Sequence, residues 1–183
     1  MGLLHMEVVK ERLEREFDLD LIATSPSVDY HVYKTDGTMI EITSPQDLPE
    51  VTKIDRIDEP YLKAKIIVPP EYVGTVMQLV VDHRGVSEDM VYLSDKSVEM
   101  IFSIPLAELI LDFFDQLKSR TKGYASLDYE FDSYRTSDLV KLDILLAGDV
   151  VDALSFIVHK DKAYDLARGL CDRLKGIIPQ QLF

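Results

Sequence analysis

The sequence predicts an α+β fold centred on a ferredoxin-like βαββαβ sandwich in residues 59–134. Two observations carry this prediction. Strand-like and helix-like segments follow each other in the order βαββαβ, with Pro and Gly residues between them. Apolar residues recur at every second position in the strand-like segments and at every third or fourth position in the helix-like ones. The flanking segments, 1–44 and 135–183, show shorter mixtures of both patterns, so we expect them to be partial α/β units.

The N-terminal segment begins with an amphipathic helix at about residues 3–17. Its apolar residues lie at helical spacing and its charges form i,i+4 pairs: Met6, Val9, Leu13 and Phe17, with Lys10–Glu14, Glu11–Arg15 and Arg12–Glu16. Three strands are expected next, at Leu19–Thr24, Val28–Lys34 and Met39–Thr43, the last two joined by a turn at Asp36-Gly37. One helix and three strands can hardly cover a core of their own.

Residues 45–58 lack periodicity and are bracketed by Pro-containing pairs, so this stretch is expected to be a linker. The sandwich follows it. Its strands are expected at Tyr61–Val68, Val86–Leu93, Val98–Ile104 and 124–132, and its helices after Pro69-Pro70 and at 105–118. The alternation in the last strand predicts that one set of side chains faces the core: Ala125, Leu127, Tyr129 and Phe131.

The C-terminal segment predicts a strand at Leu139–Leu146, a turn at Gly148-Asp149 and a returning strand at Val150–Val158. A helix at about Asp161–Leu174 is expected to begin with Asp161 as N-cap and to end at Gly176 and Pro179.

Composition limits the classes of protein that fit. The longest apolar runs are well short of the roughly 18 residues that a membrane span needs, and the amino terminus does not resemble a signal peptide. The single Cys171 excludes an internal disulfide. The net charge of -13 argues against free-standing nucleic-acid binding. The acid excess lies in residues 1–134, whereas residues 135–183 are balanced.

Three long blocks of the sequence resemble one family throughout. They are GLLHMEVVKERLEREFDLDLIATSPSV (2–28), EPYLKAKIIVPPEYVGTVMQLVVDHRGV (59–86) and VDALSFIVHKDKAYDLARGLCDRLKGIIPQQLF (151–183). All three resemble the LepA (elongation factor 4) family of translational GTPases, and the segment from Ile104 to Asp143 does so as well. The first two blocks also resemble elongation factor G more loosely.

The resemblance implies an arrangement of domains. Residues 1–44 would be the second half of a unit similar to domain III of elongation factor G, and residues 59–134 would be similar to its domain V. Residues 135–183 would begin the LepA-specific C-terminal domain and end in mid-domain, which would expose a sheet edge and favour self-association. The chain is therefore expected to be a C-terminal fragment that lacks the GTPase domain.

The resemblance also implies a function for the full-length protein. That protein would hydrolyse GTP with Mg and bind the ribosome, with proposed roles in reverse translocation or ribosome assembly. It would be cytoplasmic, with peripheral association at the inner membrane and an organellar origin both left open. The implied partners are RNA and protein at the large-subunit stalk base, and transfer RNA. For this fragment we expect no cofactor, no small-molecule substrate and no catalysis.

The residues themselves offer no catalytic, cofactor or metal site. Neither GxxxxGK[ST] nor GxGxxG occurs, and the histidines lack ligand spacing: His5, His31, His83 and His159. Cys171 has no base nearby in sequence and is interpreted as a packed helical thiol. Carboxylate pairs such as Asp112/Asp115 are interpreted as a solvated face. The Pro69-Pro70 turn lacks the backbone donors that an acylphosphatase-like anion cradle needs.

Two groups of residues remain as candidate contact sites. The first group lies near the end of the second sandwich helix. Its cations either stabilise the negative C-terminal end of the helix dipole or, as the family implies, contact ribosomal RNA. Its members are Lys118, Arg120, Lys122, Tyr124 and, from another loop, Arg84. The second group, His159, Lys160 and Lys162, would contact transfer RNA or simply face solvent. The alternative function is a small-molecule-binding regulatory domain of ferredoxin-like fold, and an enzyme with its own site comes third.

Overall fold

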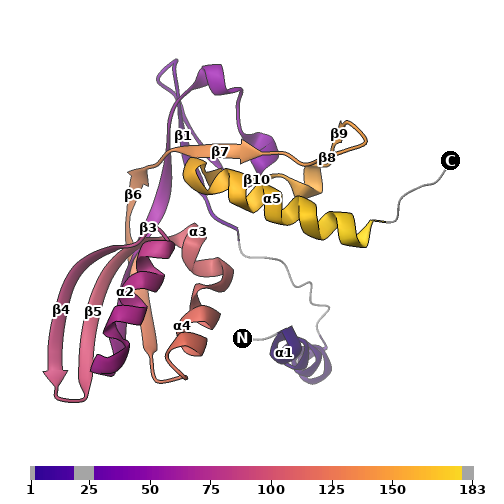
Figure 1. Cartoon of the computed structure of the whole chain (residues 1–183). Helices are drawn as coiled ribbons and strands as arrows, with labels where there is room; N and C mark the ends of the chain where they lie inside the picture. The colour runs from indigo at the N-terminus through magenta and orange to yellow at the C-terminus, as the bar shows by residue number, and fades with distance from the viewer. Residues whose placement is uncertain (1–2, 19–26, 179–183) are drawn as a thin grey trace. The chain divides into compact units, whose positions relative to one another are not determined.

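The computed structural model describes residues 3–18 and 27–178 of the chain (Figure 1). The chain divides into two compact units: unit 1 is Met1–Ser27 with Leu62–Asp132, and unit 2 is Val28–Tyr61 with Ser133–Phe183. Strands β3 (Ile54–Val68) and β6 (Ser126–Thr136) each contribute residues to both units. The strand predicted at Leu19–Thr24 lies outside the described residues. The division into segments 1–44, 45–58, 59–134 and 135–183 stays a prediction.

Unit 1 contains the predicted βαββαβ order. Strand β3 leads through the short 3-10 helix η3 (Pro70–Tyr72) into α2 (Val73–Asp82), and β4 (Val86–Ser94) pairs with β5 (Ser97–Pro105) as an antiparallel hairpin. A second helical segment then leads to β6. Strand β3 lies between β5 and β6, which gives the order β6-β3-β5-β4 of a split βαβ sheet. The predicted ferredoxin-like sandwich is therefore confirmed.

The core of unit 1 lies between one face of this sheet and the helices. Every second residue of β3 and β5 is buried there, together with the inner residues of the helical segments: Leu62, Ala64, Ile66, Val68, Val98, Met100, Phe102, Ile104, Val76, Leu79, Val80, Leu109, Phe113 and Leu117. This is the period of two in strands and of 3.6 in helices that the sequence shows. At the turn into β4, a Cβ on Gly85 would lie 2.4 Å from Val80 Cγ1, so only glycine fits.

Two details of unit 1 differ from the prediction. The helix expected at 105–118 is split into α3 (Leu106–Glu108), a π-helical turn η4 (Leu109–Phe113) and α4 (Phe114–Arg120). Ala125, just before β6, is buried, but along the strand Tyr129 is 55% and Phe131 59% exposed. The expectation that these two aromatic side chains face the core was wrong, because β6 runs on to Thr136 and only its first residues pack against the core cluster.

The helix α1 (Leu3–Phe17) has the predicted length. Its three i,i+4 ion pairs form as expected, between Lys10 and Glu14, Arg12 and Glu16, and Glu11 and Arg15. These pairs are exposed, so each is expected to add only about 0.3–0.5 kcal/mol to the helix. Among the described residues, no helix is long and apolar enough to cross a membrane.

Unit 2 contains the predicted hairpin of β1 (Tyr30–Lys34) and β2 (Met39–Ile42). Gly37 has a φ of +86°, which its turn position requires, and the Asp36 carboxylate accepts a hydrogen bond from Thr38 N at 2.9 Å. Strand β1 also pairs with the first half of β3, with Val32 opposite Ile57. Strand β3 thus begins at Ile54, seven residues earlier than predicted. The short helices η1 (Pro45–Asp47) and η2 (Val51–Lys53) precede it.

The rest of unit 2 is more broken than predicted. In place of two long strands there are β7 (Leu139–Leu142), β8 (Leu145–Leu146), β9 (Asp149–Val150), the 3-10 helix η5 (Asp152–Leu154) and β10 (Phe156–His159). The tight turn is Ala147-Gly148, because Leu146 is opposite Asp149. The Ser155 hydroxyl donates to Asp143 at 2.6 Å and Ile144 is buried, so contacts between the two segments interrupt both predicted strands.

Helix α5 (Lys160–Ile177) follows β10 and runs past Gly176. Its N-cap is His159, whose Nδ1 accepts a hydrogen bond from Asp161 N at 3.3 Å, so the expectation of Asp161 as N-cap was wrong. Cys171 is exposed on this helix rather than packed, which corrects the interpretation of a buried thiol.

Candidate functional site

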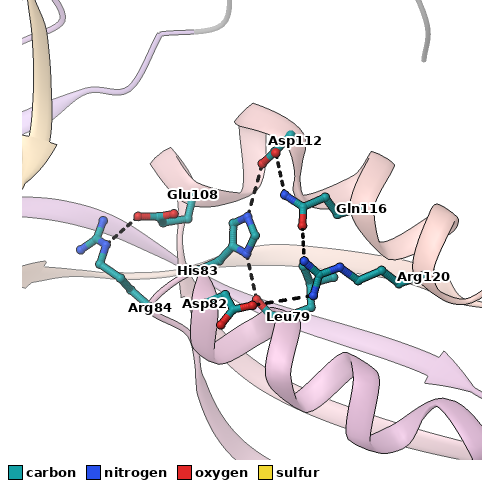
Figure 2. A network of polar contacts seen from close by, with 8 residues as sticks. All are labelled: Leu79, Asp82, His83, Arg84, Glu108, Asp112, Gln116 and Arg120. Carbon is teal, nitrogen blue, oxygen red and sulfur yellow. Dashed lines mark hydrogen bonds and ion pairs between the residues drawn. The ribbon is translucent and has the colours of Figure 1, made fainter. Parts of the chain in front are cut away.

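A chain of polar contacts follows the seam between α2 and the second helical segment of unit 1 (Figure 2). Its centre is His83, the residue that caps α2 and that is 7% exposed. Ring atom Nδ1 lies 2.8 Å from Leu79 O, and Nε2 lies 3.3 Å from Asp112 Oδ1. Both ring nitrogens of His83 therefore face oxygen atoms that can accept a hydrogen bond.

Asp112 connects His83 to the C-terminal end of α4. Its Oδ2 accepts from Gln116 Nε2 at 2.6 Å, and Gln116 Oε1 accepts from Arg120 at 2.7 Å. The Arg120 guanidinium also lies 3.7 Å from Asp82 Oδ2, on α2. Figure 2 shows these side chains as one row that joins the two helices. In the sequence, His83 has no histidine or cysteine at ligand spacing, and its position directly after a helix end is the signal that points to a capping role.

The pKa of Asp112 depends on this row. Partial burial raises it, but hydrogen bonds from Gln116 and His83 outweigh that effect, so the pKa lies below its usual value.

Replacing Asp112 by Asn is therefore expected to lower the free energy of unfolding above about pH 4, where the unfolded carboxyl is ionised. The loss should shrink as pH falls through the folded pKa. The side chain is 61% exposed, so we expect less than about 1 kcal/mol.

Urea unfolding of the Asp112→Asn variant and the wild type at pH 6 and pH 3 measures this effect. Asp115→Asn, which removes an exposed carboxylate from the adjoining helix α4, is the matched control. A difference between wild type and the Asp112→Asn variant that is equal at both pH values would contradict the prediction.

Arg84 does not lie open to solvent as a nucleic-acid contact would. Its side chain is 15% exposed, and its Nε donates to Glu108 Oε1 at 2.8 Å, where the Glu108 side chain is 9% exposed. The pair joins the end of α2 to α3, and Arg84 has a φ of +58° in the turn. A mostly buried ion pair of this kind holds secondary-structure elements together. Arg84 therefore has a structural role, which distinguishes it from the other predicted contact residues.

The remaining predicted cations of unit 1 lie around the end of α4. Lys118 Nζ donates to Ala125 O at 2.6 Å and lies 5.6 Å from the Phe114 ring. Part of its role is therefore to bind groups near the end of α4. Arg120 takes part in the row described above. Lys122 is exposed in the turn at a φ of +52°, and Tyr124 is 68% exposed. Lys122 and Tyr124 are thus the members of this group that project most openly.

Tyr124 also borders a hollow of about 370 Å³ at the same end of unit 1. Three loops form it, after β3, between β4 and β5, and before β6: its lining residues are Pro69, Pro70, Glu71, Asp95, Lys96 and Tyr124. The Tyr124 ring stacks on Tyr72, with centroids 6.3 Å apart and planes at 21°. From the sequence, the two prolines indicate only a turn that lacks backbone donors.

The predicted contacts of unit 2 lie at the start of α5. His159 caps the helix and is 19% exposed, whereas Lys160 is 66% exposed and lies 3.7 Å from Asp138 Oδ2. Lys162 is half-buried. The three residues are close together, as predicted. However, His159 already caps the helix and Lys160 already pairs with Asp138. Within residues 3–18 and 27–178, no group of three His, Cys, Asp or Glu side chains could hold a metal ion.

Comparison with known proteins relates two consecutive segments of the chain to translation factors. Residues 56–145 match the family described as elongation factor G C-terminus, and residues 146–183 match that described as GTP-binding protein LepA C-terminus. Elongation factor 4 of Streptococcus thermophilus is 59% identical over 183 residues, and that of Geobacillus thermodenitrificans is 57% identical. Each alignment covers 100% of this chain and 30% of the relative, so the chain spans about 30% of the length of the curated relatives it matches.

A solved crystal structure from Thermus thermophilus aligns with 64% of this chain and 14% of its own, at a TM-score of 0.43 and 20% identity. That likeness is too distant to support an argument. The sequence relatives are much closer, and the two family matches are contiguous from residue 56 to the end. On these matches, the chain belongs to the elongation factor 4 (LepA) family and corresponds to the C-terminal part of its members.

Proposed function

We propose that this chain is the ribosome-binding C-terminal part of an elongation factor 4, a translation factor. The observation that carries the proposal is the identity of 57–59% to elongation factor 4 over all 183 residues. The role of such a factor in reverse translocation or ribosome assembly is part of the same proposal. The ferredoxin-like unit would contact the stalk base of the large subunit. A small-molecule regulatory domain, the alternative from sequence, is not favoured by these relatives.

We propose further that these residues do not catalyse. One matching family is named for GTP binding, so GTP and Mg would belong to another part of the full-length protein. This chain should then show no binding heat in a calorimetric titration with GTP and no GTP turnover, with an intact factor as positive control. Micromolar binding would contradict the proposal. We place the protein in the cytoplasm, and peripheral association with the inner membrane remains a prediction of the resemblance.

The contact surface that we propose for ribosomal RNA is the end of α4 in unit 1. Lys122 and Tyr124 are its exposed members, and Lys118 and Arg120 lie beside them with partial internal partners. Cations attract RNA phosphates without reading sequence, and an exposed aromatic ring can stack on an unpaired base. Arg84 is left out of this surface because its guanidinium is held by Glu108.

Replacing Lys118, Arg120 and Lys122 together by Ala in an intact factor should weaken ribosome binding about tenfold or more at 0.1 M salt. Three fewer phosphate contacts should also flatten the dependence of log affinity on log salt by about 2–3 units. Sedimentation with ribosomes at several salt concentrations measures both quantities. The triple variant Lys10→Ala, Lys53→Ala and Lys63→Ala, which removes three half-exposed or exposed lysines elsewhere, is the control. Unchanged binding together with a lower melting temperature would show that the α4 cations serve only the helix end.

For unit 2 we propose an RNA contact at the start of α5, with transfer RNA as the partner. Lys160 is the most exposed of the three candidates, while His159 and Lys162 would support it. Lys160→Glu should then weaken crosslinking of an intact factor to transfer RNA on the ribosome, whereas Lys175→Glu, near the other end of α5, should not. Equal loss with both variants would mean that the effect is general charge repulsion.

A further inference from the structure

The hollow at the end of unit 1 has a chemical character that differs from that of an RNA contact. The loops that form it lie together at the lower end of the unit in Figure 1, where β3 ends, the β4–β5 hairpin turns and β6 begins. Its volume of about 370 Å³ is enough for one side chain and part of a backbone, at the low end of small-molecule sites. The hollow therefore suits a single protruding group.

The walls of the hollow disfavour an anion. Pro69 and Pro70 have no backbone N–H to donate, so the turn cannot form the cradle of amides that binds phosphate at many helix starts. Glu71 and Asp95 contribute two carboxylates, against one ammonium from Lys96. A phosphate placed here would meet a net negative rim, whereas a cation would be attracted.

The aromatic side of the hollow also favours a cation. The Tyr124 ring is 68% exposed and stacks on Tyr72. Partial burial, and after it the neighbouring Glu71 carboxylate, raise the pKa of Tyr72, as expected for a carboxylate that lies close to the ring pair. A cation over a tyrosine face is attracted by the negative face of the ring quadrupole. A carboxylate beside the ring adds to this attraction.

Among cationic groups, arginine fits these walls best. Its guanidinium is planar, so it can stack on Tyr124 while its N–H groups donate in pairs to a carboxylate. Its alkyl stem can lie on the two prolines. We propose that this hollow binds an arginine side chain presented by a basic protein segment. The proposal goes beyond the proposed RNA contact, since it assigns Tyr124 to a protein partner in the hollow instead of to an RNA base and leaves Lys122 to face RNA.

Titration of the isotope-labelled full chain with the peptide acetyl-Gly-Arg-Gly-amide, followed by NMR, tests the proposal. The amide signals of Glu71, Lys96 and Tyr124 should shift and saturate. The peptide with lysine in place of arginine should bind about threefold to tenfold more weakly, because an ammonium neither stacks nor donates in pairs. The citrulline peptide, which is planar but neutral, and uridine monophosphate should cause no saturable shift. Equal shifts with citrulline, or larger shifts with uridine monophosphate, would overturn the proposal.

Variants decide whether the named groups bind the peptide. Tyr124→Ala should abolish the saturable shift, Tyr124→Phe should retain it, and Glu71→Gln and Asp95→Asn should each weaken it several-fold. Tyr129→Ala removes a tyrosine of similar exposure from β6 and should leave binding unchanged. Full binding by the Tyr124→Ala variant would overturn the proposal. The titration contains no ribosomes, so its failure would not affect the proposed function, and loss of ribosome binding would not affect the hollow.

Discussion

Replacing Phe102 by Ala is expected to lower the free energy of unfolding of the ferredoxin-like unit by about 3–5 kcal/mol. Phe102 lies on β5 with no exposed surface, and it is among the largest fully buried side chains of the described residues. Removing its ring takes away apolar area and leaves a cavity among side chains from β3, α2 and α4, which can close only in part. Urea unfolding followed by circular dichroism measures the loss.

Phe114→Ala is the matched control for this substitution. Phe114 belongs to the adjacent helix α4 but is 40% exposed, so its loss should cost well under half as much. Similar losses for both phenylalanines would show that burial in this core does not determine its stability.

The second large effect is expected at Arg84, where replacement by Met should lower the free energy of unfolding by about 3 kcal/mol. Methionine keeps the length of the side chain but removes the guanidinium that the Glu108 carboxylate contacts at 2.8 Å. A carboxylate that is 9% exposed and loses this partner keeps its desolvation cost but loses the attraction of the guanidinium. Thermal or urea unfolding measures the change.

Lys122→Met is the control for Arg84, because Lys122 is an exposed cation that likewise has a positive φ. It should change stability by no more than about 0.5 kcal/mol. If Arg84→Met left stability unchanged but weakened ribosome binding of an intact factor, Arg84 would belong to the contact surface after all. The two variants together thus distinguish a structural cation from a binding one.

Several predictions failed where side chains far apart in sequence determine the environment. Tyr129 and Phe131 have the alternation of buried strand residues, yet the helices cover only the beginning of β6. The strand predicted at 150–158 contains η5, because Ser155 bonds to Asp143 twelve residues earlier. Alternation describes the two faces of a strand, but it does not state which part of a face another element will cover.

The candidate site was predictable only in part. Its location at the end of α4 followed from the cations after an apolar stripe, which is a local pattern. The roles of the individual cations did not follow, since Arg84 finds Glu108 24 residues away and His83 finds Asp112 29 residues away. The acidic, aromatic hollow needs three loops that are separated in sequence, so no single segment indicates it.

The sequence by itself determined the order of elements in the sandwich, the hairpin at Asp36-Gly37, the helix α1 with its ion pairs, and membership of the family. These features depend on contacts between near neighbours or on long stretches of matching residues, and both can be read along the chain. Only the tertiary structure decided which cations are held inside the unit and which reach solvent. The physical reason is that the energy of a charge depends on burial and on partners, and both are set when distant segments pack together.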